Sequence, residues 1–130
     1  MPKVSLQSRG ISPGITATDL QRSIRFYVEG LGFSIADKHE VDGQLRYVLL
    51  KAGDAELGMG QDDFAKGKDR SKGVAIRLWF TTKQDLQPLA EQLKRAGFTL
   101  DSEVAPLPWG QIAFAVTDPD GFMLTIANPR

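Results

Sequence analysis

Apolar positions along this chain follow a strand-like period, then a helical period, then a strand-like period again. Residues 11–17 form a short run of apolar and small side chains, which predicts a strand. Apolar side chains then recur at helical spacing at Leu20, Ile24, Tyr27, Val28 and Leu31. Asp19 is expected to cap this helix, because its carboxylate can accept hydrogen bonds from free backbone N–H groups of the first turn. Gly30 and Gly32 are expected to end it.

The remainder of the first half predicts three strands joined by turns. The strand-forming side chains gather at residues 33–37, 45–50 and 55–59. Residues 38–43 are charged and end in Asp-Gly, which is typical of a hairpin turn, and we expect His39 to be an exposed residue of this turn. The predicted order of the first half is therefore strand, helix and three strands.

The second half repeats this order after a polar connection. Residues 61–72 carry many charges among few apolar side chains, which predicts a solvated linker. Residues 74–80 predict a strand, and Asp85 is expected to open a helix with Pro88 in its first turn, where proline removes no intrahelical hydrogen bond. The last three strands are predicted at 98–104, 109–116 and 122–127. Residues 118–121 (Asp-Pro-Asp-Gly) predict a tight turn whose carboxylates accept hydrogen bonds from backbone N–H groups.

The two halves also share short signatures at an offset of about 65 residues, which indicates a duplicated unit. Asp-Leu-Gln opens the predicted helix at 19–21 and again at 85–87, and Gly-Phe follows each helix at 32–33 and 97–98. The 130 residues suit one compact core. We therefore predict a single domain over 1–130, with modules at 9–60 and 73–128 and a linker at 61–72. Function is expected in a cleft that the two halves share.

Composition limits the classes of partner. The chain has 16 basic and 16 acidic side chains and a formal net charge of zero, so no overall field attracts nucleic acid or an anionic membrane. Because there is no cysteine, disulfides, thiolate metal sites and thiol nucleophiles are excluded. Residues 1–5 lack the apolar segment of a secretion signal, and no apolar run is long enough to cross a bilayer. We expect a cytoplasmic protein with no membrane and no nucleic-acid partner.

The repeated strand, helix and three-strand unit resembles the vicinal oxygen chelate superfamily, which includes glyoxalases, bleomycin-resistance proteins and extradiol dioxygenases. The resemblance extends from about residue 11 to residue 127 and is clearest at 19–27, 31–33, 108–110 (Pro-Trp-Gly) and 118–121. It implies an α+β fold, in which tandem βαβββ modules form a curved mixed sheet around a concave cavity, and a homodimer. Because this fold hosts several reactions as well as plain binding, the resemblance alone does not define the chemistry.

Metal-dependent members of this family hold one divalent ion with four side chains, mostly His, Glu or Gln. The resemblance places Ser12, Glu56 and Thr125 at three of these positions, and the fourth falls on Val74, Ala75 or Ile76. Only Glu56 is a strong ligand for such an ion, and His39 is far in sequence from all four positions. We therefore predict no metal and no cofactor, which is typical of the bleomycin-resistance branch.

Without a metal, the side chains of the cavity wall carry the function. Because successive strand residues point to opposite faces, Arg77 and Trp79 are expected to face the cavity. Their neighbours Val74, Ile76, Leu78 and Phe80 are expected to pack on the helices. A guanidinium pairs with an anionic or carbonyl oxygen, and an indole stacks on a planar or cationic ligand. The alternative is structural: Arg77 pairs with Glu56 across the cavity, and Trp79 fills space or a dimer contact.

Other strands supply further candidates for the cavity wall. The same alternation selects Ser12, Thr125 and Gln111 as hydrogen-bonding groups. Trp109 corresponds to an aromatic residue near the cavity mouth of similar proteins, and its alternative role is to cover the proline-rich turn beside it. The predicted ligand-binding residues are Ser12, Glu56, Arg77, Trp79, Trp109, Gln111 and Thr125, with no catalytic residue.

These residues favour metal-independent sequestration of a planar, partly polar small molecule, similar to antibiotic resistance of the bleomycin type. A Ser-His or Cys-His nucleophile is excluded, because the sole histidine lies in a charged segment and there is no cysteine. One alternative is a metal-dependent lyase or oxidoreductase of the glyoxalase or dioxygenase type, whose incomplete site is finished by a partner subunit or by the substrate. Another alternative is a purely structural dimer module.

Overall fold

The computed structural model describes residues 3–130 and confirms an α+β fold with two four-stranded mixed sheets. The elements of the first half are β1 (Gly14–Ala17), α1 (Leu20–Arg25), η1 (Phe26–Gly30), β2 (Ser34–Val41), β3 (Gln44–Ala52) and β4 (Ala55–Gln61). Those of the second half are β5 (Arg77–Thr81), α2 (Leu86–Arg95), β6 (Leu100–Pro106), β7 (Ile112–Thr117) and β8 (Met123–Ala127). The strand orders β1-β4-β3-β2 and β5-β8-β7-β6 make β1 and β5 the end strands of their sheets.

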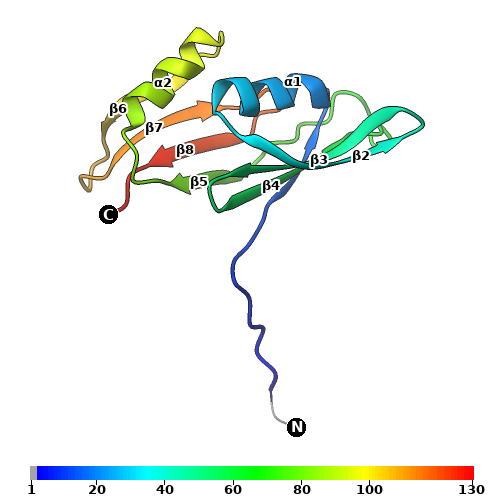
Figure 1. The fold of residues 1–130 in the computed structure, drawn as a ribbon, viewed down its shortest axis with the longest axis horizontal. Helices are drawn as coiled ribbons and strands as arrows, with labels where there is room; N and C mark the ends of the chain where they lie inside the picture. Colours follow the sequence, from blue (N-terminus) through cyan, green and yellow to red (C-terminus); the bar gives the residue numbers. More distant parts are fainter. Residues whose placement is uncertain (1–2) are drawn as a thin grey trace.

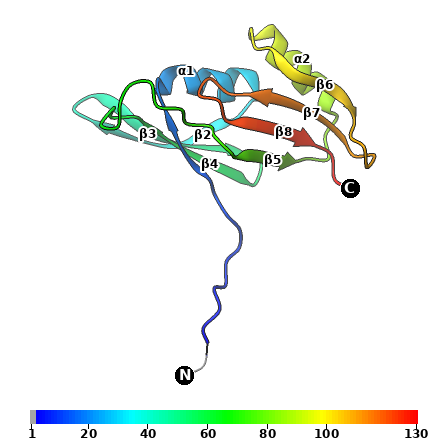
Figure 2. The ribbon, with the colours of Figure 1, turned by 180° about the vertical axis from the view of Figure 1, so that it is seen from behind.

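The helices lie on one side of the two sheets, and the N-terminal segment leaves on the opposite side (Figure 1, Figure 2). Buried side chains of both halves form one core. Phe26 packs edge-on against Phe98 with ring centroids 5.0 Å apart, and Phe33 packs against Phe80 at 5.7 Å. Because each of these pairs joins the first half to the second, the halves share a single core instead of having one each.

Each helix begins after the aspartate expected from the sequence. Asp19 accepts a hydrogen bond from the backbone N–H of Arg22 at 3.3 Å, and Asp85 accepts one from Gln87 at 3.2 Å. α1 continues directly into the π-helical turn η1, and Gly32 follows with φ of 77°. Glycine adopts this left-handed conformation without the steric cost that other residues meet, which explains the helix end.

A side-chain amide at the end of each half makes an equivalent hydrogen bond, as expected for a duplicated unit. The Gln61 amide donates to the carbonyl of Thr18 at 2.7 Å and accepts from the N–H of Leu20 at 2.9 Å. The Asn128 amide donates to the carbonyl of Thr82 at 2.8 Å. In both halves the last strand is thereby tied to the chain that connects the first strand with its helix.

The hairpin of the first half is longer than predicted. β2 continues to Val41, so that His39 is an exposed strand residue and not a turn residue. The turn itself is limited to Asp42 and Gly43, both of which have positive φ. A charged sequence proved compatible with a strand because both faces of this part of the hairpin are exposed.

The first strand of the second half is shorter than predicted. Ala75 has φ of 59°, which bends the chain, and the regular strand begins only at Arg77. Val74 and Ile76 are 66% and 43% exposed, so the prediction that they pack on the helices is wrong. Leu78 is buried, as the alternation predicted.

The connection between the halves contains a buried ion pair, which corrects the expectation of a purely solvated linker. The Asp62 carboxylate lies 3.1 Å from Nζ of Lys72 and 3.6 Å from the guanidinium of Arg70. The side chains of Asp62 and Lys72 are only 5% and 3% exposed. The hydrogen bond with Lys72 is the main cause that lowers the pKa of Asp62, and the hydrogen bond from the backbone N–H of Phe64 is the second. The two ends of the connection are thus fixed to each other.

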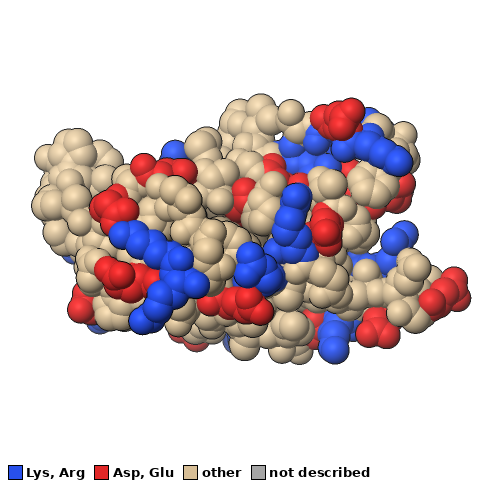
Figure 3. Space-filling view, turned by 90° about the horizontal axis from the view of Figure 1, so that it is seen from above, with Lys and Arg blue, Asp and Glu red and all other residues tan. Residues whose placement is uncertain are grey.

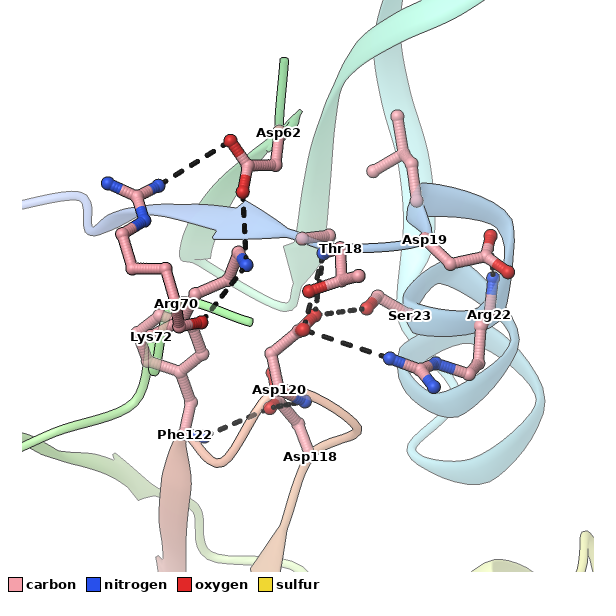
Figure 4. A network of polar contacts seen from close by, with 12 residues as sticks. Thr18, Asp19, Arg22, Ser23, Asp62, Arg70, Lys72, Asp118, Asp120 and Phe122 are labelled. Atoms are coloured by element: carbon pink, nitrogen blue, oxygen red, sulfur yellow. Dashed lines mark hydrogen bonds and ion pairs between the residues drawn. The ribbon is translucent and has the colours of Figure 1, made fainter. Parts of the chain in front are cut away.

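The turn after β7 joins the second half to the first. Both carboxylate oxygens of Asp120 accept from the backbone N–H of Thr18, at 3.2 and 3.1 Å, and one of them accepts from the Ser23 hydroxyl at 3.3 Å (Figure 4). The guanidinium of Arg22 lies 3.7 Å from the same carboxylate. Asp120 therefore adds, from the opposite half of the chain, a second carboxylate to that of Asp19 at the start of α1.

Asp118, two residues earlier, makes a second contact between the halves. Its carboxylate accepts the hydroxyl hydrogen of Tyr27 at 2.8 Å and the backbone N–H groups of Asp120 and Phe122 at 2.8 and 3.0 Å. Burial raises the pKa of Asp118 and raises that of the Tyr27 hydroxyl well above its usual value. The hydrogen bonds to backbone N–H groups confirm the predicted role of acidic residues in this turn.

The surface on the helical side of the molecule carries charges of both signs. Lysine and arginine side chains alternate there with aspartate and glutamate (Figure 3). This distribution agrees with the formal net charge of zero and provides no single-sign patch on that face. No helix within residues 3–130 has the length and hydropathy needed to span a membrane.

Candidate functional site

A cavity of about 970 Å³ lies between β1 and β5, the end strands of the two sheets. Its lining includes residues 8–15, residues 54–56 at the turn between β3 and β4, and residues 76–82. Its apolar lining includes the core residues Leu31, Phe33, Phe122 and Ile126. Because successive residues of β5 contribute, the cavity follows the edge of this strand and not one face of the sheet. Its volume is that of a small-molecule site.

Arg77 supplies a fixed positive charge to this cavity, which Arg9 also lines. Its Nη1 donates to the Thr125 hydroxyl at 3.0 Å, and its Nη2 lies 3.5 Å from Sδ of Met123. Both contacts follow from the parallel pairing of β5 with β8, which sets Arg77 opposite Met123. Within residues 3–130 the guanidinium forms no ion pair with a carboxylate. Arg77 is therefore held in place while its charge is left to interact with an anionic or carbonyl oxygen.

Glu56 lines the same cavity from β4, where it is half-buried. In the described part of the chain, the ion pair between Glu56 and Arg77 that the sequence left open is not formed. Ser12, which precedes β1, also contributes to the lining. The cavity lining thus contains two carboxylates, Asp54 and Glu56, two guanidinium groups, Arg9 and Arg77, and several serine and threonine hydroxyl groups. Within residues 3–130 neither guanidinium forms an ion pair with either carboxylate.

Trp79 and Thr81 line both this cavity and a neighbouring smaller hollow of about 410 Å³. Trp109 and Gln111 line the smaller hollow and not the larger cavity. Thr125 is 5% exposed and lies beneath Arg77, lining neither. Of the predicted ligand-binding residues, the structure brings together Ser12, Glu56, Arg77 and Trp79 around the larger cavity.

Two parts of the lining were missed by sequence reasoning. Residues 8–10 lie before the predicted first strand, yet they line the larger cavity. Arg130 lines the smaller hollow, with its guanidinium 5.8 Å from the ring centroid of Trp109. Neither of these two segments contains a sequence motif that indicates a binding site. These residues belong to the site only because the chain before β1 and the strand β5 line one cavity, and because the segment after β8 lies near Trp109.

The donor atoms present do not fit a divalent metal ion. The hydroxyl of Thr125 already accepts a hydrogen bond from Arg77, whose positive charge would repel a cation bound at that position. Ile76 and Ala75 have no side-chain donor, so Glu56 is the one carboxylate at the positions that the family uses. No group of three or more His, Cys, Asp or Glu residues within 3–130 is placed to hold a metal. The chemistry that these side chains support is ligand binding.

The fold and the cavity together define a protein of tandem βαβββ modules with a small-molecule-sized cavity at the junction of its halves. The chain belongs to the Glyoxalase/Bleomycin resistance protein/Dioxygenase superfamily, whose family model matches residues 11–126. This match confirms the resemblance drawn from the repeated signatures.

Similar proteins carry names of more than one kind. A protein of Vibrio cholerae named "Probable lactoylglutathione lyase" is 32% identical over 124 residues, covering 86% of this chain and 84% of its own. The structure of TioX from Micromonospora sp. ML1 has a TM-score of 0.75 at 16% identity, covering 93% of this chain and 98% of that chain. A glyoxalase-related enzyme from Fulvimarina pelagi has a TM-score of 0.72 at 22% identity, covering 94% and 89%. At these identities the two structures show the fold alone.

Proposed function

We propose that this chain is a cytoplasmic protein that binds and sequesters a small molecule in the cavity between β1 and β5 without a metal ion. The observation that carries this proposal is the Arg77 guanidinium, which Thr125 fixes and which no carboxylate in residues 3–130 neutralises. An anionic or carbonyl oxygen of the ligand would supply the missing partner. Trp79 offers a flat apolar surface beside it, and Glu56 would accept a hydrogen bond from the ligand. The ligand class is a planar, partly polar molecule.

Replacing Arg77 with glutamine is expected to weaken binding of planar carboxylates at least tenfold, because a charged hydrogen bond contributes about 1.5–3 kcal/mol. The measurement is a thermal-shift screen of aromatic carboxylates and their neutral amides, followed by calorimetry of the best ligand. Arg95→Gln is the matched control, since Arg95 is an exposed residue at the end of α2. Equal affinities in Arg77→Gln and the unaltered protein would refute the assignment of Arg77.

The second candidate function is a glyoxalase-type lyase, which the name of the Vibrio cholerae relative favours. We rank it second because one carboxylate and two hydroxyl groups at the family's ligand positions are a weak donor set for a divalent ion. Assaying lactoylglutathione lyase activity with and without added divalent metal separates the two functions. Metal-dependent turnover that Glu56→Gln abolishes would favour the lyase over sequestration.

We also propose that the protein is a homodimer, with the N-terminal segment at residues 3–13 contacting the second copy. Val4, Leu6 and Ile11 are 91%, 90% and 93% exposed, and the segment extends away from the body of the chain (Figure 1, Figure 2). Large apolar side chains that are this exposed indicate a surface that a partner covers. Members of the superfamily often dimerise. A second copy would also close the cavity, which residues 8–11 line.

Changing Val4, Leu6 and Ile11 together to serine is expected to raise the dimer dissociation constant at least tenfold, since each buried side chain of this type contributes about 1.5–3 kcal/mol. Light scattering after size-exclusion chromatography measures the effect over a dilution series. The matched control changes the polar neighbours Ser5 and Gln7, which do not line the cavity, to alanine. A serine variant that dissociates at the same concentration as the control would exclude this segment from the interface.

A further inference from the structure

The smaller hollow beside the main cavity contains both tryptophans of the chain. Trp79 and Trp109 are 47% and 55% exposed. Thr81, Gln111, Pro129 and Arg130 complete its lining. Two exposed indoles at one hollow provide the apolar surface on which a planar ring stacks.

Two hydrogen bonds in series fix the orientation of the Trp109 indole. The Trp109 Nε1–H donates to Oε1 of Gln111 at 2.8 Å. Gln111 in turn donates through Nε2 to the carbonyl of Asn128 at 2.7 Å. The Trp109 ring is therefore oriented before any ligand arrives, which reduces the entropy lost on binding.

A cation lies against the same ring. The Arg130 guanidinium is 5.8 Å from the centroid of Trp109, within the range of a cation–π contact. In the part of the chain that the structure describes, Arg130 forms no ion pair with a carboxylate. Its guanidinium is thus placed to meet an anionic substituent of a ring that stacks on Trp109.

We infer that this hollow is a second subsite, which binds a planar aromatic group carrying an anionic substituent. The ring lies against Trp109 and Trp79, and the anion pairs with Arg130. This inference rests on the proposed function, because Trp79 also lines the main cavity and a ligand with two polar ends would span both spaces. The ligand class becomes an aromatic anion with a second carbonyl or acidic group for Arg77.

The two tryptophans give two indole N–H signals in a proton–nitrogen NMR spectrum, which makes a direct test possible. The probe is 2-naphthoate, a planar aromatic carboxylate, and Trp109→Phe assigns the signals. We expect the Trp109 signal to move saturably during the titration. Arg130→Gln should raise the fitted dissociation constant roughly fivefold, which is a modest effect because this charge is solvent-exposed. Arg95→Gln should leave the dissociation constant unchanged.

The neutral analogue 2-naphthamide separates charge recognition from stacking. It is expected to bind the unaltered protein and Arg130→Gln with the same affinity, because it has no anion for Arg130. A stationary Trp109 signal, or an equal 2-naphthoate affinity in Arg130→Gln, would overturn the subsite. Movement of the Trp79 signal alone, abolished by Arg77→Gln, would overturn the subsite while supporting the main cavity. Movement of Trp109 that survives Arg77→Gln would support the subsite even if the main cavity fails its own test.

Discussion

Replacing Gly73 with alanine is expected to lower the free energy of unfolding by about 2–3 kcal/mol, the largest effect of any single methyl group added to this chain. A Cβ atom at Gly73 would overlap the carbonyl group of Gly121 and the backbone nitrogen of Phe122. These are backbone atoms, so no side-chain rotation relieves the overlap. Gly73 also donates its N–H to the carbonyl of Asp120 at 3.2 Å, and the added methyl group would push this contact apart.

Urea denaturation measures this effect, with Gly14→Ala as the matched control. A Cβ at Gly14 meets nothing within 4 Å, and Gly14 is not among the glycines with positive φ. The control should therefore unfold within about 0.5 kcal/mol of the unaltered protein, as surface substitutions do. Equal midpoints for Gly73→Ala and Gly14→Ala would show that the connection does not pack on the turn as the structure describes.

Replacing Asp120 with alanine is expected to lower the free energy of unfolding by about 2 kcal/mol, because it leaves buried donors without partners. The backbone N–H of Thr18 and the hydroxyl of Ser23 would both lose their acceptor. The Asp120 side chain is only 4% exposed, so water replaces these contacts poorly. Differential scanning calorimetry measures the change in stability.

Asp54→Ala is the control for Asp120→Ala. Asp54 is an exposed aspartate in the turn between β3 and β4, the counterpart in the first half of the turn that contains Asp120. Its loss should leave stability within about 0.5 kcal/mol. If both variants lost the same stability, the effect would belong to turn aspartates in general and not to the contact between the halves.

These two substitutions also bear on the cavity. Asp120 contacts the chain just after β1, and Gly73 lies in the connection just before β5. β1 and β5 are the two strands between which the cavity lies. The turn at 118–121 therefore contributes to the spacing of the cavity walls, and weakening it should also weaken ligand binding.

Local sequence patterns were sufficient to predict the repeat, the helix caps and the turn at residues 118–121. Asp19 and Asp85 accept hydrogen bonds from residues two or three positions away, so their role is visible within one turn of chain. The order of strands and helices follows from hydrophobic period, which is also local. The same alternation places Arg77 and Trp79 on the face of their strand opposite the buried Leu78, which was predicted to face the cavity.

Contacts between distant residues were not predictable from these patterns. Asp120 and Thr18 are 102 positions apart, and nothing near Asp120 distinguishes a carboxylate that caps its own turn from one that reaches the other half. The bend at Ala75 also had no signature, since this residue gives no sign of positive φ. The division of the predicted site into a cavity at Arg77 and a hollow at Trp109 depends on how the strand edges meet.

Calorimetric titration in the presence of EDTA, using the tightest aromatic carboxylate from the thermal-shift screen, tests metal-independent binding at Arg77 most directly. The expected result is saturable binding that EDTA does not change and that Arg77→Gln weakens at least tenfold. Binding that appears only after a divalent metal is added, and that Glu56→Gln abolishes while Arg77→Gln does not, would contradict it.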